Sequence, residues 1–314
     1  MAITAFLSLK SLTGGITLLK TKLEQIHFRD PYILTSPQRG KYYLYGSIGQ
    51  NVWDGPAIGF DVYESEDLLH WQGPRECFRP AADFWSDRHY WAPEVHEWAG
   101  RYFMFASFKA EGVPRVTGVL VAEQPEGPFV PWCRSLTPPD WECLDGTLYV
   151  DEQGEPWMIF CREWVQVEDG EMYAVRLNAE LNGTIGDPVF LFSASEAVWS
   201  VGTGDQRNRY VTDGPFLYRM ENGELVMLWS TMGQEGYTMG LARSQSGRPT
   251  GPWAQDEIPL FAKDGGHGML FRTLSGELAL TIHSPNIHPD ERPVIFYIQE
   301  QAGQLRLMDN LPNK

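Results

Sequence analysis

Four carboxylates and one histidine stand beside proline or glycine at widely separated points of the chain. They are Asp30 in RDP, Glu94 in WAPE, Asp145 in LDG, Asp213 in TDGP and His267 in GHG. A lone Asp-Gly or Asp-Pro pair is typical of a turn. Five such groups brought together would shift one another's pKa values, at a cost in stability that indicates a use. Paired carboxyl groups suit general acid and base catalysis, in which one gives a proton and the other removes one.

The elements that would position these groups recur five times. Each of the five polar residues stands at the start of a short apolar run. A second strand, which begins with glycine and is rich in aromatic residues, follows that run. These second strands are GKYYLYGS (40–47), GRYFMFAS (100–107), GEPWMIFC (154–161), GELVMLWS (223–230) and GELALTIHS (276–284). A third run follows each of them, and an aromatic edge follows four of the five third runs. The apolar alternation within the runs is that of half-buried strands.

A unit of four strands repeated at fixed order predicts an all-β fold, a five-bladed β-propeller with four antiparallel strands per blade. A β-sandwich also has many short strands, but it does not explain a five-fold recurrence. We expect residues 26–314 to form one propeller domain. Residues 1–25 would be an N-terminal extension, whose stretch around residues 16–19 pairs with the last blade. The first strand of each blade would line the central channel, so the five polar groups would meet around one axis at matched positions.

Composition excludes several classes of protein. The 314 residues carry 25 Lys and Arg against 41 Asp and Glu, a net charge of −16, so nucleic acid is not an expected partner. No apolar run of about 18 residues exists to cross a membrane, and the N-terminus lacks the layout of a signal peptide, so a cytoplasmic protein is expected. The four cysteines form no CxxC pair and are expected to be buried free thiols. Oligomeric state is not set by the sequence.

The ordered motifs HFRDPYIL, WAPEVHEWAGRYFMFAS, LDGTLYVDEQGEPWMIF, TDGPFLYRMENGELVMLWS and GGHGMLFR resemble glycoside hydrolase family 43. The resemblance spans about residues 26–300. It implies an inverting glycosidase that removes α-L-arabinofuranosyl or β-xylosyl units from plant-derived oligosaccharides. It also implies that Asp30 is the general base and that Asp145 is the carboxylate that tunes and orients the acid. His267 matches a channel histidine of the family that often lies near a bound calcium ion, and Arg292 loosely matches an arginine that contacts the sugar.

One position departs from the family pattern. The family's general acid is usually the Glu of a Glu-Gly-Pro motif, and this chain has Asp213 there. The side chain is shorter by one methylene, and a misplacement of about 1 Å can cost a catalytic group about 100-fold in rate. Either the pocket suits Asp213 or another carboxylate gives the proton. Glu163, at the end of the second strand of the third blade, is the best substitute, and Glu94 is a weaker one.

Aromatic side chains would form the sugar-binding faces. Trp91 and Trp164 flank the candidate carboxylates, and the loop of residues 47–56 could shape the pocket. Glu94 is expected to bind substrate as well. The histidines at positions 283 and 288 form no closed metal set and are expected to be rim or structural residues.

Three alternatives remain open at this point. The departure at Asp213 leaves room for a carbohydrate-binding propeller with impaired catalysis. A related five-bladed enzyme could act on other glycosides. Phosphorolysis would need a basic pocket, for which Arg29, Arg162 and Arg292 are the candidates.

Overall fold

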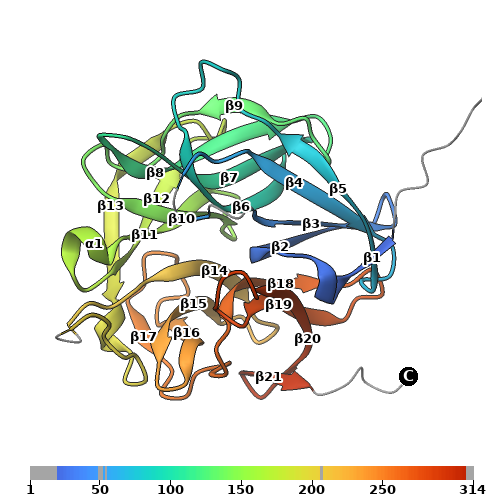
Figure 1. Cartoon of the computed structure of the whole chain (residues 1–314). Coiled ribbons are helices and arrows are strands. Elements are labelled where there is room, and N and C mark those ends of the chain that lie inside the picture. Colours follow the sequence, from blue (N-terminus) through green and yellow to red (C-terminus); the bar gives the residue numbers. More distant parts are fainter. Residues whose placement is uncertain (1–19, 49–51, 54, 206–207, 309–314) are drawn as a thin grey trace, which may run out of the picture.

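The computed structural model describes residues 20–48, 52–53, 55–205 and 208–308. Five antiparallel sheets stand in a ring around a central channel (Figure 1), so the all-β, five-bladed propeller is confirmed. Four sheets have four strands, and the first blade carries a fifth at its outer edge. No helix in the described part of the chain is long and apolar enough to cross a membrane.

In each blade the strands are hydrogen-bonded in chain order, from the channel outward. The first blade contains β2 (Arg29–Ser36), β3 (Lys41–Ser47), β4 (Phe60–Ser65) and β5 (His70–Phe78). The second contains β6 (Arg88–Trp98), β7 (Arg101–Ala110), β8 (Val113–Ala122) and β9 (Val130–Cys133). The third contains β10 (Cys143–Val150), β11 (Pro156–Arg162), β12 (Glu171–Leu177) and β13 (Thr184–Ser193). The fourth contains β14 (Asp213–Arg219), β15 (Leu225–Gly233), β16 (Gly236–Ser244) and β17 (Trp253–Gln255). The fifth contains β18 (Gly266–Arg272), β19 (Leu278–Ser284), β20 (Arg292–Gln301) and β21 (Gln304–Met308).

The described part of the N-terminal segment joins the first blade. Strand β1 (Lys20–Lys22) pairs antiparallel with β5, the outer strand of that blade. The turn η1 (Leu23–Gln25) then packs against β20 of the fifth blade. The stretch 16–19, expected to pair with the last blade, lies outside the described residues. The ring itself closes by contact of β2 with β18 and β19.

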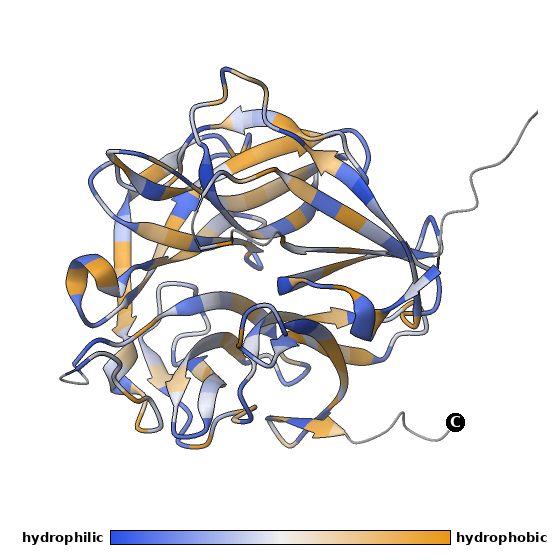
Figure 2. Ribbon diagram, viewed as in Figure 1, coloured by the Kyte–Doolittle hydropathy of each residue, from blue (hydrophilic) through white to orange (hydrophobic). Residues whose placement is uncertain are grey.

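The hydrophobic core lies between neighbouring blades. Its four clusters of buried side chains each draw on adjacent sheets, and the hydrophobic positions fall mainly on the strands (Figure 2). Such packing buries both faces of a blade, so the strands alternate less strictly than in a sheet with one wet face. All four cysteines are free, as expected; Cys77, Cys143 and Cys161 are buried, whereas Cys133 is half-buried and not fully buried as predicted. The other short helical elements are α1 (Trp164–Val167) and η2 (Ala194–Glu196).

Trp229 is the position at which we expect a core substitution to be most costly. Its side chain is fully buried, its rings lie 5.2 Å from Trp199 and 5.3 Å from Phe192, and its indole nitrogen donates to Gln255. Trp229→Ala should lower the free energy of unfolding by about 3–5 kcal/mol, measured by urea denaturation. Trp53→Ala, at a side chain that is 47% exposed, should change it by less than about 0.5 kcal/mol. Equal losses in the two variants would contradict this assignment.

Candidate active site

The first strand of every blade has the same irregularity near its start. The pairing register with the second strand shifts there, and the chain passes through a residue with positive φ. These residues are Asp30 (52°), Ala92 (46°), Asp145 (55°), Gly214 (53°) and His267 (42°). Positive φ is unfavourable for a non-glycine residue and persists where the surrounding structure holds it, often at functional sites. The repeated bulge therefore turns one residue of each blade toward the centre.

This repeat corrects the expectation that five polar groups occupy matched positions. The matched residue of the second blade is Ala92, and Glu94 lies two residues further along the strand. In the fourth blade it is Gly214, and Asp213 precedes the bulge by one residue. Proline or glycine follows each bulge residue, so the motifs look alike in sequence although the side chains differ in register.

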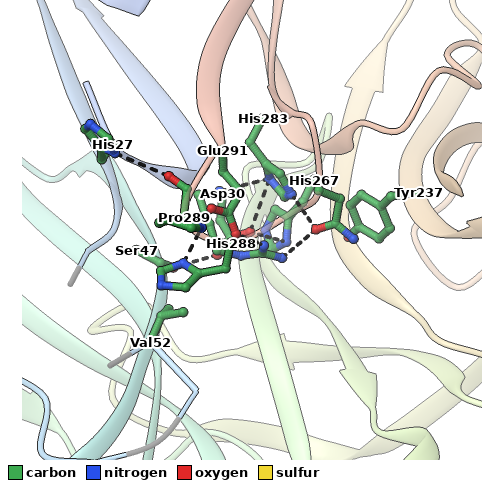
Figure 3. A network of polar contacts seen from close by, with 12 residues as sticks. His27, Asp30, Ser47, Val52, Tyr237, His267, His283, His288, Pro289 and Glu291 are labelled. Atoms are coloured by element: carbon green, nitrogen blue, oxygen red, sulfur yellow. Dashed lines mark hydrogen bonds and ion pairs between the residues drawn. The ribbon is translucent and has the colours of Figure 1, made fainter. Parts of the chain in front are cut away.

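Asp30 is held from several directions (Figure 3). Ser47 donates its hydroxyl to Oδ2 at 2.6 Å, and Nδ1 of His267 lies 3.3 Å from Oδ1. Burial would raise the pKa of Asp30, but the charges of His267 and Arg29 outweigh it and the pKa is lowered. Asp30 is therefore ionised over the physiological range, as a general base must be.

Asp145 and Asp213 have the opposite electrostatics. Burial is the largest influence on each, and it raises the pKa of Asp213 and raises that of Asp145 to about 8. The amide of Gly214 donates to Asp145 Oδ2 at 3.1 Å, and Tyr237 donates its hydroxyl to Asp213 Oδ2 at 2.9 Å. The negative charge of Asp213 is a further cause of the raised pKa of Asp145, so these carboxyl groups hold their protons above the usual range of an aspartic acid.

His267 supplies the positive charge of the cluster. Its Nδ1 lies 3.3 Å from Asp30 and 3.6 Å from Asp145. Burial would lower its pKa, but the surrounding carboxylates outweigh burial and the pKa of His267 is raised. A low pKa on Asp30 beside raised pKa values on Asp145 and Asp213 is the separation that acid–base catalysis needs.

These groups open into a cavity of about 310 Å³, at the small end of the range for small-molecule sites. Of the residues expected from sequence, it is lined by Asp30, Trp91, Asp145, Glu163, Trp164, Asp213 and His267. Val52 and Trp53, from the loop of residues 47–56, also line it, whereas positions 49–51 and 54 of that loop lie outside the described residues. The cavity thus combines aromatic faces with carboxylates, the combination that sugar binding requires.

Glu163 lies at the wall of this cavity and is bound by a cation. The guanidinium of Arg115, on β8, donates to its Oε2, and both side chains are buried. The same guanidinium lies 4.1 Å over the ring of Trp91 and contacts His89, which is itself stacked on Trp91 at 4.3 Å. Burial raises the pKa of Glu163 while Arg115 opposes the rise. The pair fixes Glu163 in place with its charge compensated.

Breaking this pair should destabilise the protein. Glu163→Gln leaves the buried charge of Arg115 without its counter-ion, and we expect a loss of about 3 kcal/mol in the free energy of unfolding. Adding Arg115→Met in the same chain should restore part of it, because the unpaired charge is removed. Urea denaturation of the single and double variants checks this, and a double variant less stable than the single one would contradict it.

Two expected site residues lie away from the cavity. Glu94 is buried, and its Oε2 lies 3.2 Å from Nε2 of His96. Arg292 donates to the carbonyl oxygens of Pro289 and Glu291 and is not among the lining residues. Glu94 lies two residues past the bulge of its strand, and Arg292 is bound to main-chain oxygens, so neither side chain lines the cavity.

Two residues at the site have partners that the sequence does not reveal. Tyr237 lines the cavity from β16 and stacks on His283 with ring centroids 5.5 Å apart. Arg29 is bound by Glu291 at 2.5 Å and by Asn286 at 2.8 Å. The partners of Arg29 are 262 and 257 residues away, and Tyr237 contacts a histidine of the next blade, so no local pattern could reveal these contacts. Of the two histidines expected to be rim or structural residues, His283 is fully buried and His288 lines the cavity.

The side chains described around His267 do not form a ready set of calcium ligands. Calcium takes about six to eight oxygen ligands. In the parts of the chain that the structure describes, no three His, Cys, Asp or Glu side chains are placed to hold a metal ion. Nδ1 of His267 faces carboxylates instead. The described side chains therefore form no closed calcium site by themselves, and calcium near His267 stays a prediction.

Carboxyl groups whose pKa values are moved in opposite directions, in a cavity that aromatic rings also line, suit the acid–base cleavage of a glycosidic bond. The family model "Glycosyl hydrolases family 43" matches residues 25–295. The chain belongs to this family.

Similar proteins agree with this assignment. The crystal structure of an endo-arabinase from Bacteroides thetaiotaomicron VPI-5482 is 42% identical, with a TM-score of 0.84 over 90% of this chain and 98% of that one. The extracellular exo-α-(1→5)-L-arabinofuranosidase ArbA of Cellvibrio japonicus (strain Ueda107) is 24% identical over 79% of this chain and 72% of its own length. An α-L-arabinofuranosidase from Lactobacillus brevis, 17% identical over 93% of this chain and 98% of its own, shares the fold with a TM-score of 0.73.

Proposed function

We propose that this glycoside hydrolase cleaves α-L-arabinofuranosyl bonds of oligosaccharides with inversion, with β-xylosyl bonds as the next candidate substrate. The observation that carries the proposal is the divided electrostatics of the cavity: the pKa of Asp30 is lowered, and those of Asp145 and Asp213 are raised. An inverting glycosidase needs an ionised base and a protonated acid on opposite sides of the bond. The names of the arabinanase and arabinofuranosidase relatives support arabinose as the sugar.

Asp30 acts as the general base in this proposal. It takes a proton from a water molecule that attacks the anomeric carbon. Its hydrogen bond from Ser47 and the positive charge of His267 hold it ionised and oriented. Arg29 adds positive charge nearby and is itself fixed by Glu291.

Asp213 is the better candidate for the general acid. The hydroxyl of Tyr237 donates to Oδ2 of Asp213, so the transferable proton belongs on Oδ1. Among the described residues, no basic side chain forms an ion pair with Asp213. Glu163 also has a raised pKa, because burial outweighs Arg115, but its Oε2 is held in the ion pair with that arginine, which suits Glu163 to bind sugar hydroxyls instead. Asp145, bound to the Gly214 amide beside the acid, would orient Asp213 and share its proton.

Phosphorolysis has little support. Of the three arginines considered for a phosphate pocket, only Arg29 lines the cavity, and Glu291 already neutralises it. Arg162 lies near Glu171, at 3.5 Å, and Arg292 is bound to carbonyl oxygens. A phosphate-binding site needs several basic side chains that face the same pocket and are not already paired with carboxylates.

The decisive experiment is turnover by the wild-type protein. Its substrates would be α-(1→5)-arabino-oligosaccharides and the 4-nitrophenyl glycosides of α-L-arabinofuranose and β-D-xylose. Proton NMR of the first sugar released should show the inverted anomer. Release of the retained anomer would contradict the inverting mechanism. Binding of these sugars without any turnover would favour the reading of a carbohydrate-binding propeller instead.

A further inference from the structure

A ring of hydrogen bonds joins each blade to the next. One position near the end of every second strand pairs with the residue that precedes the bulge of its own blade. These positions are Ser47, Ser107, Cys161, Ser230 and His283. Each serine accepts a hydrogen bond from the bulge amide of the following blade. The bonds are Ala92 N to Ser47 Oγ (2.8 Å), Asp145 N to Ser107 Oγ (3.0 Å) and His267 N to Ser230 Oγ (2.9 Å).

The fifth blade has a histidine in the ring. Nδ1 of His283 accepts the amide hydrogen of Asp30 at 3.2 Å, which closes the ring between the last blade and the first (Figure 3). Because Nδ1 accepts, the ring hydrogen belongs on Nε2, which donates to Asn286 Oδ1 at 3.1 Å. The same oxygen accepts from Arg29 at 2.8 Å. A serine would hold the amide of Asp30 but would not reach this asparagine and arginine.

The third blade has a thiol in the ring. Cys161 is fully buried, and its sulfur lies 3.8 Å from the sulfur of Met172. The bulge amide of the next blade, that of Gly214, donates instead to Asp145 Oδ2 at 3.1 Å. A thiol is a weak acceptor, whereas a hydroxyl at this position would compete for that amide, as in three other blades.

The two departures from serine face the two blades that carry the proposed base and acid. We propose that Cys161 and His283 are positioning residues of the catalytic site: Cys161 leaves the Gly214 amide to Asp145, and His283 couples the Asp30 backbone to Asn286 and Arg29. The inference rests on the proposed function, which assigns the base to Asp30 and the acid to Asp213. The ring of hydrogen bonds thus departs from serine at the two contacts between blades where a reacting carboxyl group must be oriented.

Restoring serine at each position tests the inference. In Cys161→Ser the new hydroxyl should accept the Gly214 amide and release Asp145. The acid then loses its orienting neighbour, and kcat on an α-(1→5)-arabino-oligosaccharide should fall about 10- to 100-fold with KM little changed. On 2,4-dinitrophenyl α-L-arabinofuranoside, whose leaving group needs little protonation, the fall should be under about 3-fold. Cys161→Ala offers the Gly214 amide no oxygen acceptor, so the ratio of its kcat values on the two substrates should stay that of the wild type, whereas Cys161→Ser should change that ratio.

His283→Ser should have a different signature. The base activates water whatever the leaving group, so kcat should fall by a similar factor, about 10-fold or more, on both substrates. His283→Asn keeps an acceptor for the Asp30 amide and a donor toward Asn286, and it should recover part of the rate. This rescue also shows whether loss of activity reflects loss of folding.

Crystal structures of the serine variants separate this inference from the proposed function. If the wild-type protein cleaves none of the substrates, the proposed function fails. The crystal structures still show whether a serine in the ring takes the amide of the next blade. The Cys161 assignment is overturned if the Gly214 amide stays on Asp145 in Cys161→Ser, or if that variant matches Cys161→Ala in the ratio of kcat on the two substrates. The His283 assignment is overturned if His283→Ser keeps wild-type kcat, or if Arg29 and Asn286 keep their positions in its structure.

Discussion

Asp30→Asn is expected to lower kcat on arabino-oligosaccharides by about 10³-fold or more, with KM within a few-fold of the wild type. The amide has the shape of the carboxylate and can still accept the Ser47 hydroxyl, so binding and folding should survive. It cannot take a proton from water, and general-base catalysis contributes about 10²–10⁴-fold. The loss should be equally large on an activated aryl glycoside, because the attacking water needs the base with either leaving group.

Glu94→Gln is the matched control for this change. It also removes a buried carboxylate from the channel, but one that faces His96 and does not line the cavity. Its kcat should stay within a few-fold of the wild type. If Asp30→Asn kept full activity, or if both variants lost activity alike, Asp30 would not be the base.

Asp213→Asn is the second large effect we expect. On arabino-oligosaccharides kcat should fall by about 10²–10⁴-fold, because the sugar leaving group must be protonated as the bond breaks. On 2,4-dinitrophenyl α-L-arabinofuranoside the fall should be about 10-fold or less, since this phenolate leaves without a proton. The ratio of the two losses identifies the acid. Glu163→Gln is the comparison variant, and we expect it to raise KM more than it lowers kcat on both substrates.

The pH profile gives the same assignment independently. The wild-type rate requires Asp30 ionised, so it should fall only when the pH drops through the lowered pKa of Asp30. It also requires a proton on the acid, so it should fall as the pH rises through the raised pKa values of Asp213 and its neighbour Asp145. Asp213→Asn should abolish the alkaline limb on the activated substrate and keep the acidic one. An alkaline limb that disappears in Glu163→Gln and persists in Asp213→Asn would make Glu163 the acid.

Much of the architecture could be predicted because it depends on local patterns. Alternating apolar residues and glycine-led turns recur in the same order five times, and only a radial array of blades satisfies that recurrence. Once the blades are known, the start of each first strand must lie near the axis. The sequence therefore predicts that four of the reactive groups meet near the axis. The structure places all four at one cavity: Asp30, Asp145, Asp213 and His267.

The tertiary structure alone decided what each group does there. A bulge in every first strand sets which side chain turns inward, and a shift of one or two residues separates Asp213 and Glu94 from the matched positions. Glu163 takes its cation from Arg115, 48 residues away on another blade, and Asp30 binds a histidine 253 residues away. Such pairings depend on strand register and ring closure, which arise from the packing of whole blades. The sequence by itself thus determined the blades and the set of reactive residues, whereas their partners, and through them their pKa values, were determined by the closed ring.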